Sequence, residues 1–345
     1  MNRKEALEHY KLNQAKSLIE ECEKNFNINL RDNEEKIKAM LIEGIKSVDK
    51  KAKKVQELHD DYRLYVLQFE FLRTNIINET YKILIHGYNG LWYLDDNSVY
   101  EEIDLLFIFE PFIILKEKLL KAKKSYLGKV NNYDIQEIIF NLASKCYNQM
   151  CDNSRIWMWN LDEEEWIKES SLWDAYLIKW GEYQSKSETI FSMDNREKKV
   201  EDILEFKKKP KEKMPFVYSV WKDSILKDAD LSEEDLLFIN FKNSKLINMD
   251  FTKSNIIKGQ FKNTEVVNCR FNHSLLVGSS FENAIIKETS FESSNLTNLD
   301  FRKATFNKVS FENAIVEGAI FSENQIPFLH LTPEQLQDIY IEGGE

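Results

Sequence analysis

The stretch FKNSKLINMDFTKSNIIKGQF, residues 241–261, has phenylalanine at every tenth position and an aliphatic residue halfway between successive phenylalanines. This period of five matches neither the 3.6-residue period of a helix nor the two-residue period of a strand. The register continues without a slip from Leu231 to Phe321, and the residue two positions before each centre is usually small. An unbroken short period without proline predicts a solenoid over residues 216–326.

The repeat resembles the pentapeptide repeat family, whose pattern is a small residue, Asp or Asn, Leu or Phe, and two polar residues. Four segments carry the resemblance most clearly: DADLSEEDL (228–236), MDFTK (249–253), SNLTN (294–298) and LDFRK (299–303). In that family four pentapeptides form one square coil, with the central and the small residue pointing inward. The resemblance therefore implies a right-handed quadrilateral β-helix for residues 216–326.

In that geometry residues ten apart lie on opposite faces of a coil and residues twenty apart stack. The resemblance thus implies two facing phenylalanine ladders in the core: Phe241, Phe261, Phe281, Phe301 and Phe321, and Phe251, Phe271, Phe291 and Phe311. Aliphatic ladders lie between them, and only Phe306 departs from these. Asparagine recurs two residues after many centres, and we expect it at the corners because it tolerates left-handed backbone.

The segment LTPEQLQDIYI, residues 331–341, predicts a helix that caps the open end of the solenoid, within a carboxyl-terminal part at 327–345. Thr332 is a favourable N-cap and Pro333 suits the first helical position. An end cap is needed because the last coil would otherwise expose unpaired strand edges. The apolar residues of the segment should then lie over the last coil: Leu336, Ile339 and Tyr340.

The amino-terminal two-thirds is predicted to be mostly α-helical, of the α+β class. Residues 1–78 are predicted to form a helical hairpin, because apolar residues recur at spacings of four and three along 34–78. Dimerisation of two chains through the 34–78 helix is the alternative. Residues 79–200 are predicted to form a tryptophan-rich α+β domain. The charged stretch 195–215 is predicted to be a short helix followed by a linker into the solenoid, and residues 201–215 are assigned to that linker.

Within this α+β domain, YKILIHGYNGLWYL (81–94) alternates and predicts a β-hairpin that turns at Gly87–Gly90. Further elements are expected as follows: helices at 110–127 and 132–151, and strands around 155–161, 174–180 and 188–193. Five tryptophans could form an aromatic surface that binds a sugar, a base or a peptide, with core packing as the alternative: Trp157, Trp159, Trp166, Trp173 and Trp180.

The composition argues against several classes of protein. The net charge of −11 does not fit a nucleic-acid-binding surface built from Lys and Arg. The four cysteines are too scattered for a disulfide framework, and no histidine accompanies the closest pair, Cys146 and Cys151. The first residues lack the apolar core of a signal peptide, and the most apolar run, 103–115, is too short to span a membrane. We therefore expect a cytoplasmic protein without cofactor, metal, nucleic-acid partner or membrane segment.

Catalytic motifs such as GxGxxG, a Walker loop, HExxH and GxSxG are absent from the sequence. The predicted function is a non-enzymatic, bacterial protein-binding adaptor or scaffold, of the immunity, effector-chaperone or secretion- and defence-locus type. The resemblance also implies an alternative, a DNA mimic that protects gyrase. Residues 226–326 hold 14 acidic and 11 basic residues, a net charge of −3, which is weak for DNA mimicry. An enzyme site within residues 79–200 is the second alternative.

One outward column of the solenoid is apolar where the neighbouring columns are polar. It contains Leu237, Ile257 and Val277, and the residues Phe238 and Leu275 join it. A shorter counterpart on the opposite wall consists of Ile247 and Val267. An exposed apolar patch usually marks a contact. We expect the amino-terminal domain to fold back on this column, with a separate partner protein as the alternative.

Overall fold

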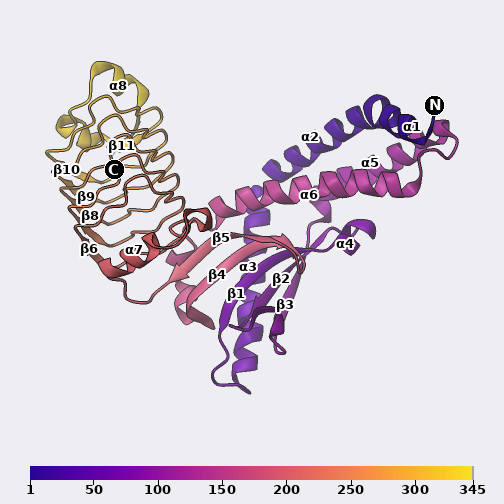
Figure 1. Cartoon of the computed structure of the whole chain (residues 1–345), viewed down its shortest axis with the longest axis horizontal. Helices are drawn as coiled ribbons and strands as arrows, with labels where there is room; N and C mark the ends of the chain where they lie inside the picture. Colours follow the sequence, from indigo (N-terminus) through magenta and orange to yellow (C-terminus); the bar gives the residue numbers. More distant parts are fainter. Residues whose placement is uncertain (344–345) are drawn as a thin grey trace. The chain divides into compact units, whose positions relative to one another are not determined.

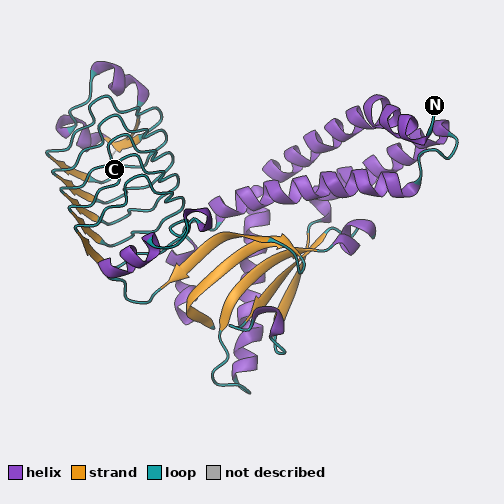
Figure 2. Ribbon diagram, in the orientation of Figure 1, coloured by secondary structure: helices purple, strands orange, loops and turns teal. Residues whose placement is uncertain are grey.

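The computed structural model describes residues 1–343, so the last two residues of the predicted cap at 327–345 lie outside it (Figure 1). The chain forms two compact units, Met1–Met193 and Asp194–Glu345. The first unit combines long helices with one five-stranded sheet, and the second contains the solenoid (Figure 2).

The first unit begins with a helical segment that ends at Asp32. Asn2 starts it with a capping box, in which its side chain accepts a hydrogen bond from the Glu5 backbone N–H. The helices of the unit are α1 (Arg3–Tyr10), α2 (Lys16–Asp32), α3 (Glu34–Gln56), α4 (Arg73–Ile77), α5 (Leu106–Ala122) and α6 (Asn132–Trp157), with a π-helical turn at Lys11–Ala15 between α1 and α2. The helices expected at 110–127 and 132–151 therefore form as α5 and α6, with shifted ends.

The prediction of a helical hairpin over residues 1–78 is wrong. Helix α3 ends at Gln56, and residues Leu64–Phe71 form strand β1. Helix α2 packs mainly along α5, which is the most apolar helix of the unit and so offers it a larger apolar surface. Val66 and Phe69 had suggested a helical stripe, but this segment pairs with a strand on each side and is buried over nearly its whole length.

The sheet of the first unit has the strand order β3-β2-β1-β4-β5. Its strands are β1 (Leu64–Phe71), β2 (Lys82–Tyr88), β3 (Val99–Asp104), β4 (Leu172–Glu182) and β5 (Ser187–Asp194). Strand β1 is antiparallel to β2 and parallel to β4. Of the hairpin expected at 81–94, only the first strand forms, as β2; Gly87 lies inside it, and Trp92–Leu94 is a 3₁₀ turn where the second strand was expected. Strand β2 pairs instead with β3, after a connection that runs from residue 89 to 98. No strand forms at 155–161, which ends α6 and continues into a short 3₁₀ turn.

Helix α3 packs on one face of this sheet at close range. A Cβ atom added to Gly87 in β2 would lie 2.7 Å from the Cγ1 atom of Val48 in α3. A Cβ atom added to Gly44 in α3 would likewise overlap Ile85. The two glycines thus allow helix and sheet to approach, and the residues between them and α5 and α6 form one apolar core.

The second unit begins with helix α7 (Val200–Lys207), which is the short helix expected within 195–215, so the linker begins after Lys207 and not at residue 201. Ile203 is fully buried in the solenoid core. The Phe206 ring lies 5.7 Å from the ring of Phe216 and 5.3 Å from the ring of Trp221, measured between centroids. Without α7, the rings of Phe216 and Trp221 would be exposed at the open end of the first coil. The helix covers them and so removes apolar surface from water.

The solenoid itself follows the predicted period. Residues twenty apart pair as parallel strands or bridges, for example Leu246 with Val266 and Asn255 with Leu275. Five short strands form one parallel sheet in the order β10-β9-β8-β7-β6: β6 (Ile225–Lys227), β7 (Lys245–Ile247), β8 (Glu265–Val267), β9 (Ile285–Lys287) and β10 (Thr305–Asn307). All nine ladder phenylalanines are buried, while Phe306 is only half-buried.

The carboxyl-terminal segment folds over the last coil through polar as well as apolar contacts. Strand β11 (Ile320–Ser322) pairs in parallel with β12 (Tyr340–Glu342), and α8 (Pro333–Asp338) lies between them in sequence. Gln335 donates hydrogen bonds to the carbonyl oxygens of Phe311 and Ala314, at 3.0 and 2.8 Å.

The expectation for the apolar residues of the segment 331–341 holds only in part. Ile339 packs against the solenoid core. Leu336 and Tyr340 are exposed, however, and 64% of the Tyr340 surface is accessible. The backbone of Tyr340 pairs with β11 as an edge strand, and this pairing leaves its side chain in solvent.

Candidate functional site

The corners of the solenoid are built from residues in the left-handed backbone conformation. The asparagines two residues after the centres have φ between +51° and +58°: Asn243, Asn248, Asn263, Asn268, Asn283, Asn298 and Asn313. Their side chains bond along the stack; Asn263 Nδ2 donates to Asn243 Oδ1 at 3.0 Å, and Asn243 Nδ2 donates to Asp223 Oδ1 at 3.0 Å. The asparagine ladders therefore stabilise corners, as the sequence predicted.

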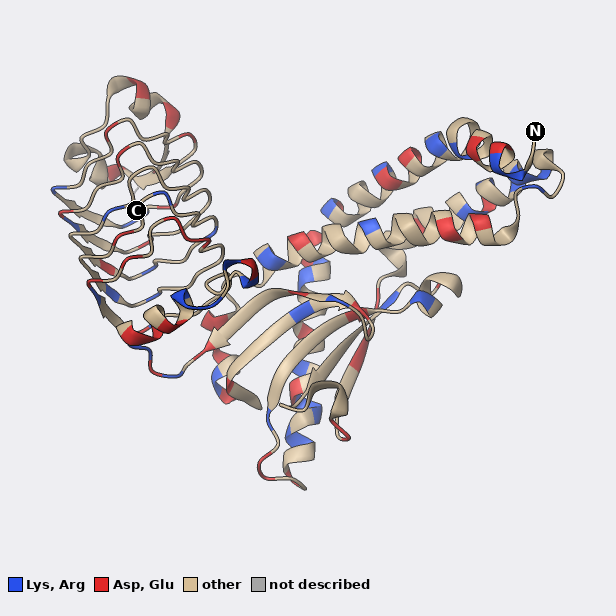
Figure 3. Ribbon diagram, in the orientation of Figure 1, with Lys and Arg blue, Asp and Glu red and all other residues tan. Residues whose placement is uncertain are grey.

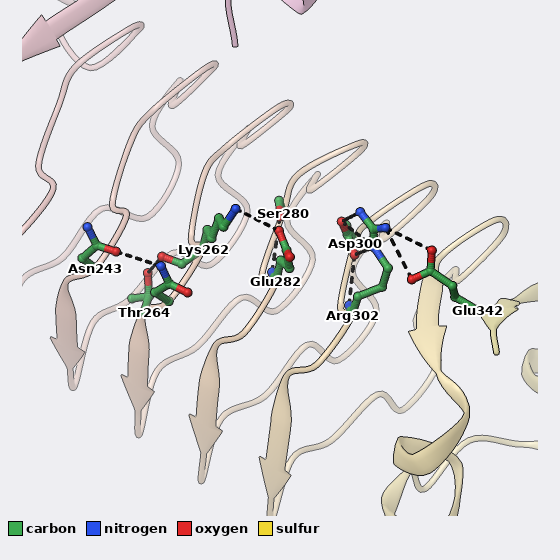
Figure 4. A network of polar contacts seen from close by, with 9 residues as sticks. Asn243, Lys262, Thr264, Ser280, Glu282, Asp300, Arg302 and Glu342 are labelled. Atoms are coloured by element: carbon green, nitrogen blue, oxygen red, sulfur yellow. Dashed lines mark hydrogen bonds and ion pairs between the residues drawn. The ribbon is translucent and has the colours of Figure 1, made fainter. Parts of the chain in front are cut away.

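Charged side chains on the outside of the solenoid are paired between successive coils. Lys262 lies 3.2 Å from Glu282, and Lys245 lies 2.7 Å from Glu265. Near the last coil, the Arg302 guanidinium lies 2.7 Å from the Asp300 carboxylate and 3.2 Å from Glu342 (Figure 4). Acidic and basic residues alternate over this surface (Figure 3). Their fields therefore largely cancel at a distance.

The residues of the column predicted to be apolar recur at the same position of successive coils. Phe238 N–H donates to the Ile257 carbonyl oxygen at 3.0 Å, which places the two coils in the expected register. Leu237, Ile257 and Val277 are half-buried, and Leu275 beside them is 44% exposed. These side chains lie on the outside of the coils and are not part of the core.

The sequence analysis missed two residues of this surface, Val217 and Tyr218, which lie one coil before Leu237 and Phe238. Tyr218 stacks on Phe238 with ring centroids 4.7 Å apart and planes inclined by 4°. Val217 stands twenty residues before Leu237, at the same position of the preceding coil. Counting back by twenty would have found both residues. We call the whole surface the apolar face: Val217, Tyr218, Leu237, Phe238, Ile257, Leu275 and Val277.

The second predicted patch, Ile247 and Val267, is smaller and more polar. Both residues are half-buried on adjacent strands β7 and β8. In their column, Lys227 precedes Ile247 and Lys287 follows Val267. Beside them, Glu265 is paired with Lys245 and with Lys287, at 2.7 and 3.6 Å. Charged residues therefore interrupt the apolar surface on this wall.

The five tryptophans do not form one aromatic surface. Trp157 and Trp180 are buried; the Trp157 indole N–H donates to Glu34 Oε1 at 2.7 Å, and the Trp180 ring packs 5.4 Å from that of Phe69. Trp159 and Trp166 are half-buried, and only Trp173 is exposed. Most of these side chains serve the core of the first unit, so they offer no shared ligand surface.

Residues 1–343 contain no group of three or more His, Cys, Asp or Glu side chains placed to hold a metal ion. All four cysteines are buried. Burial raises the pKa of the Cys151 thiol to about 12, with a smaller opposing effect of Arg155, so this thiol stays protonated at neutral pH. In the same part of the chain, each helix falls short of the length or apolar character that a bilayer crossing requires.

Similarity to known proteins is found in the second unit. The family description "Pentapeptide repeat region" matches residues 264–343. No curated protein matches the sequence.

Three solved structures show the extent of structural similarity. A pentapeptide repeat protein (Rfr23) from the cyanobacterium Cyanothece 51142 is 20% identical, with 30% of this chain and 63% of that chain covered and a TM-score of 0.20. A pentapeptide repeat protein from the Arabidopsis thaliana thylakoid lumen is 20% identical, with 32% and 71% covered and a TM-score of 0.22. QnrB1, a plasmid-mediated fluoroquinolone resistance protein, is 16% identical, with 37% and 84% covered and a TM-score of 0.17.

The family match lies within the part of the chain where residues twenty apart pair, and this pairing begins earlier, at Val220 with Asn240. Residues 264–343 of this chain thus match the pentapeptide repeat region, and the remainder of the chain lies outside that match.

Proposed function

We propose that the protein is a non-enzymatic, bacterial protein-binding adaptor, whose solenoid presents the apolar face to another protein surface. The observation that carries this proposal is the apolar face itself, whose residues recur at the same position of four successive coils on a surface that is otherwise polar. Contiguous exposed apolar surface is characteristic of contact sites.

The solenoid suits this role because it is rigid. Four pentapeptides fill each twenty-residue coil, and we take the fold as a right-handed quadrilateral β-helix with α7 and α8 as caps at its ends. The side chain of Gln325 supports the capped end, because it donates to the carbonyl oxygens of Phe301 and Ala304, at 2.7 and 2.6 Å. A preformed surface loses little conformational entropy on binding, which favours recognition by a modest number of contacts.

The charges of the solenoid favour an adaptor over a DNA mimic. A mimic of DNA must present unbalanced negative charge along its length, as the phosphates of a duplex do. Here the acidic residues at 265, 282 and 300 are paired with lysine or arginine. The repeats from 226 to 326 carry a net charge of only −3.

A capture experiment with matched variants tests the proposal. The full chain, the double variant Ile257→Glu with Val277→Glu, and the control Thr297→Glu are used as baits in lysate of the native host. Thr297 occupies the same column one coil later, where the apolar face has ended. We expect a partner that the control retains and the double variant loses. Equal capture by all three baits would refute the apolar face as the contact site.

A further inference from the structure

One end of the helical part of the first unit is formed by the turn from α5 into α6, against which α1 packs (Figure 1). Tyr126 anchors this turn, because its ring lies 5.2 Å from the ring of Tyr10 in α1, measured between centroids. Lys129 Nζ donates a hydrogen bond to the carbonyl oxygen of Met1 at 2.6 Å. We call this region the basic tip; it comprises residues 1–12 and 119–134.

The basic tip carries positive charge in a chain that is acidic overall. It contains seven basic and three acidic residues, a net charge of +4, whereas the net charge of the whole chain is −11. Six of the seven basic residues are lysine. Figure 3 shows Lys and Arg residues in blue around this end of the unit. A concentration of one charge at one end of an otherwise acidic protein indicates contact with an anionic partner.

Most of the cations in the basic tip are exposed and are not neutralised by a carboxylate. Arg3 is the exception, because it pairs with Asp134 at 3.0 Å. Elsewhere in the first unit lysines are paired, as Lys51 is with Glu101 at 3.0 Å. Four exposed lysines of the tip have no ion-pair partner within residues 1–343: Lys4, Lys11, Lys121 and Lys124. The positive field of the tip is therefore only partly cancelled, unlike the field of the solenoid surface.

A leucine stands exposed at the apex of the turn. The accessible fraction of Leu127 is 90%, whereas Tyr126 before it and Val130 after it are buried. Leu127 has φ +49° and the following Gly128 has φ +81°. A bulky residue rarely adopts this left-handed conformation, which persists only where the surrounding structure enforces it. The buried residues on either side thus hold the leucine side chain out in solvent.

Further apolar side chains are exposed at the same end of the unit: Met1, Leu12 and Tyr133. Unpaired lysines and exposed apolar groups therefore lie together in the basic tip. Protein segments that bind the surface of a bilayer combine these two features. Their lysines are attracted to anionic headgroups, their aliphatic side chains enter the boundary with the acyl chains, and their tyrosines lie at the level of the headgroups.

We propose that the basic tip binds the surface of a membrane that contains anionic lipids. The unpaired lysines contact the headgroups, and Leu127 enters the boundary between headgroups and acyl chains. Surface binding of this kind requires no helix that crosses the bilayer. The proposal concerns the first unit alone and does not depend on the apolar face of the solenoid.

Nucleic acid fits the basic tip less well. Its phosphates would attract the lysines, but contact with phosphates would leave the Leu127 side chain in water. Recognition of individual phosphates also favours arginine, whose planar guanidinium donates two parallel hydrogen bonds. The one arginine of the tip, Arg3, is already occupied by Asp134. Lysines act as point charges and suit the diffuse negative potential of a lipid surface.

Sedimentation of the full chain with lipid vesicles tests the proposal. One set of vesicles contains equal parts of phosphatidylcholine and phosphatidylserine, and the other contains phosphatidylcholine alone. We expect binding to the anionic set to be stronger by about tenfold or more, because each lysine near an anionic surface contributes roughly fivefold. High salt should release the protein by screening this attraction. Equal binding to both sets, or binding to neither, would overturn the proposal.

Matched lysine variants locate the contact. Lys121→Gln with Lys124→Gln removes two unpaired charges and should weaken binding to the anionic vesicles by about 20- to 30-fold. Lys50→Gln with Lys54→Gln makes the same charge change on α3, at exposed lysines that likewise have no ion-pair partner within residues 1–343. This control should leave binding nearly unchanged. Equal losses in the two double variants would mean that only the overall charge matters, and the basic tip would be excluded as the contact.

Leu127→Asn distinguishes a lipid surface from other anionic partners. Asparagine tolerates the left-handed backbone, so the variant should keep the melting temperature of the unmodified chain. Loss of the apolar side chain should weaken binding to the anionic vesicles by about tenfold. A DNA duplex is the second probe. Tighter binding to the duplex than to the anionic vesicles, or vesicle binding that Leu127→Asn leaves unchanged, would overturn the assignment to lipid.

Discussion

Phe261 and Phe281 stack with their ring centroids 4.3 Å apart and their planes inclined by only 3°. They are separated by twenty residues, one full coil of the solenoid, and each ring also meets the facing ladder edge-on, as Phe271 does with Phe281 at 5.8 Å. Each coil thus packs only on its two neighbours, and the stability of the second unit comes from the contacts between coils.

Phe281→Asp should destabilise the solenoid by about 3 kcal/mol or more, because it buries an unpaired carboxylate between two coils. Thermal unfolding of the full chain, combined with hydrogen exchange of peptides from residues 241–321, measures the change. Glu312→Ala, at an exposed position just after a core phenylalanine, is the control. A loss of protection no larger than that of the control would contradict the stacked ladder.

The protein should neither inhibit nor protect DNA gyrase. The physical reason is the balance of charge on its solenoid, where basic residues pair with acidic ones on adjacent coils. A supercoiling assay with and without a fluoroquinolone, titrated well above the enzyme concentration, measures both effects. Clear protection at low micromolar protein would favour DNA mimicry and reverse the preference for an adaptor.

Ile257→Glu with Val277→Glu also tests what covers the apolar face. If the amino-terminal domain covers it, as the sequence suggested, the double variant should lower the melting temperature and speed proteolysis within residues 195–215. The cause would be two carboxylates placed in an apolar contact. Thr297→Glu again serves as the control. An unchanged melt and digestion pattern, together with loss of a captured protein, would assign the face to a separate partner.

Lowering the pH should reduce the stability of the solenoid, partly because Asp250 becomes protonated. Burial acts to raise the pKa of this carboxyl, but hydrogen bonds from Thr252 and the pair with Arg270 outweigh burial and hold the pKa below its ordinary value. A carboxylate with a lowered folded-state pKa stabilises the fold above the unfolded-state pKa, and this contribution is lost as the pH falls through the folded-state value.

Asp250→Asn should therefore reduce the free energy of unfolding at pH 7 and flatten its dependence on pH between about 5 and 3. Urea unfolding at a series of pH values measures both. Glu233→Gln, on an exposed side chain of the preceding coil, provides the comparison. A pH dependence for Asp250→Asn as steep as that of the unmodified protein would rule out this role.

Helix α7 should be needed for the stability of the first coil. Ile203→Ala removes a fully buried side chain from the end of the core and should cost about 2–5 kcal/mol. Leu204→Ala, on the exposed face of the same helix, should cost little. Hydrogen exchange of residues 216–240 distinguishes the two variants. Equal protection in both would mean that α7 does not act as a cap.

The sequence determined the solenoid and its register because the determinant is repeated locally. A phenylalanine or aliphatic residue at every fifth position from 231 to 321 fixes which side chains point inward, and the twenty-residue pairing follows. The same count placed the apolar face, and extending it by one coil would have added Val217 and Tyr218. The asparagine corners were predictable for the same reason, since the left-handed conformation is a property of single residues.

Only the tertiary structure decided the first unit. Val66 and Phe69 satisfy a helical spacing as well as a strand spacing, and the choice depends on β2 and β4, which lie 16 or more positions along the chain. Strand pairing likewise brings residues 68, 86, 100 and 179 side by side across the sheet, and no local pattern connects them. Each copy of a repeat contains the residues that contact the next copy, so a short stretch of sequence is enough to predict the packing. A sheet assembled from distant segments is stabilised by pairings that no single segment encodes.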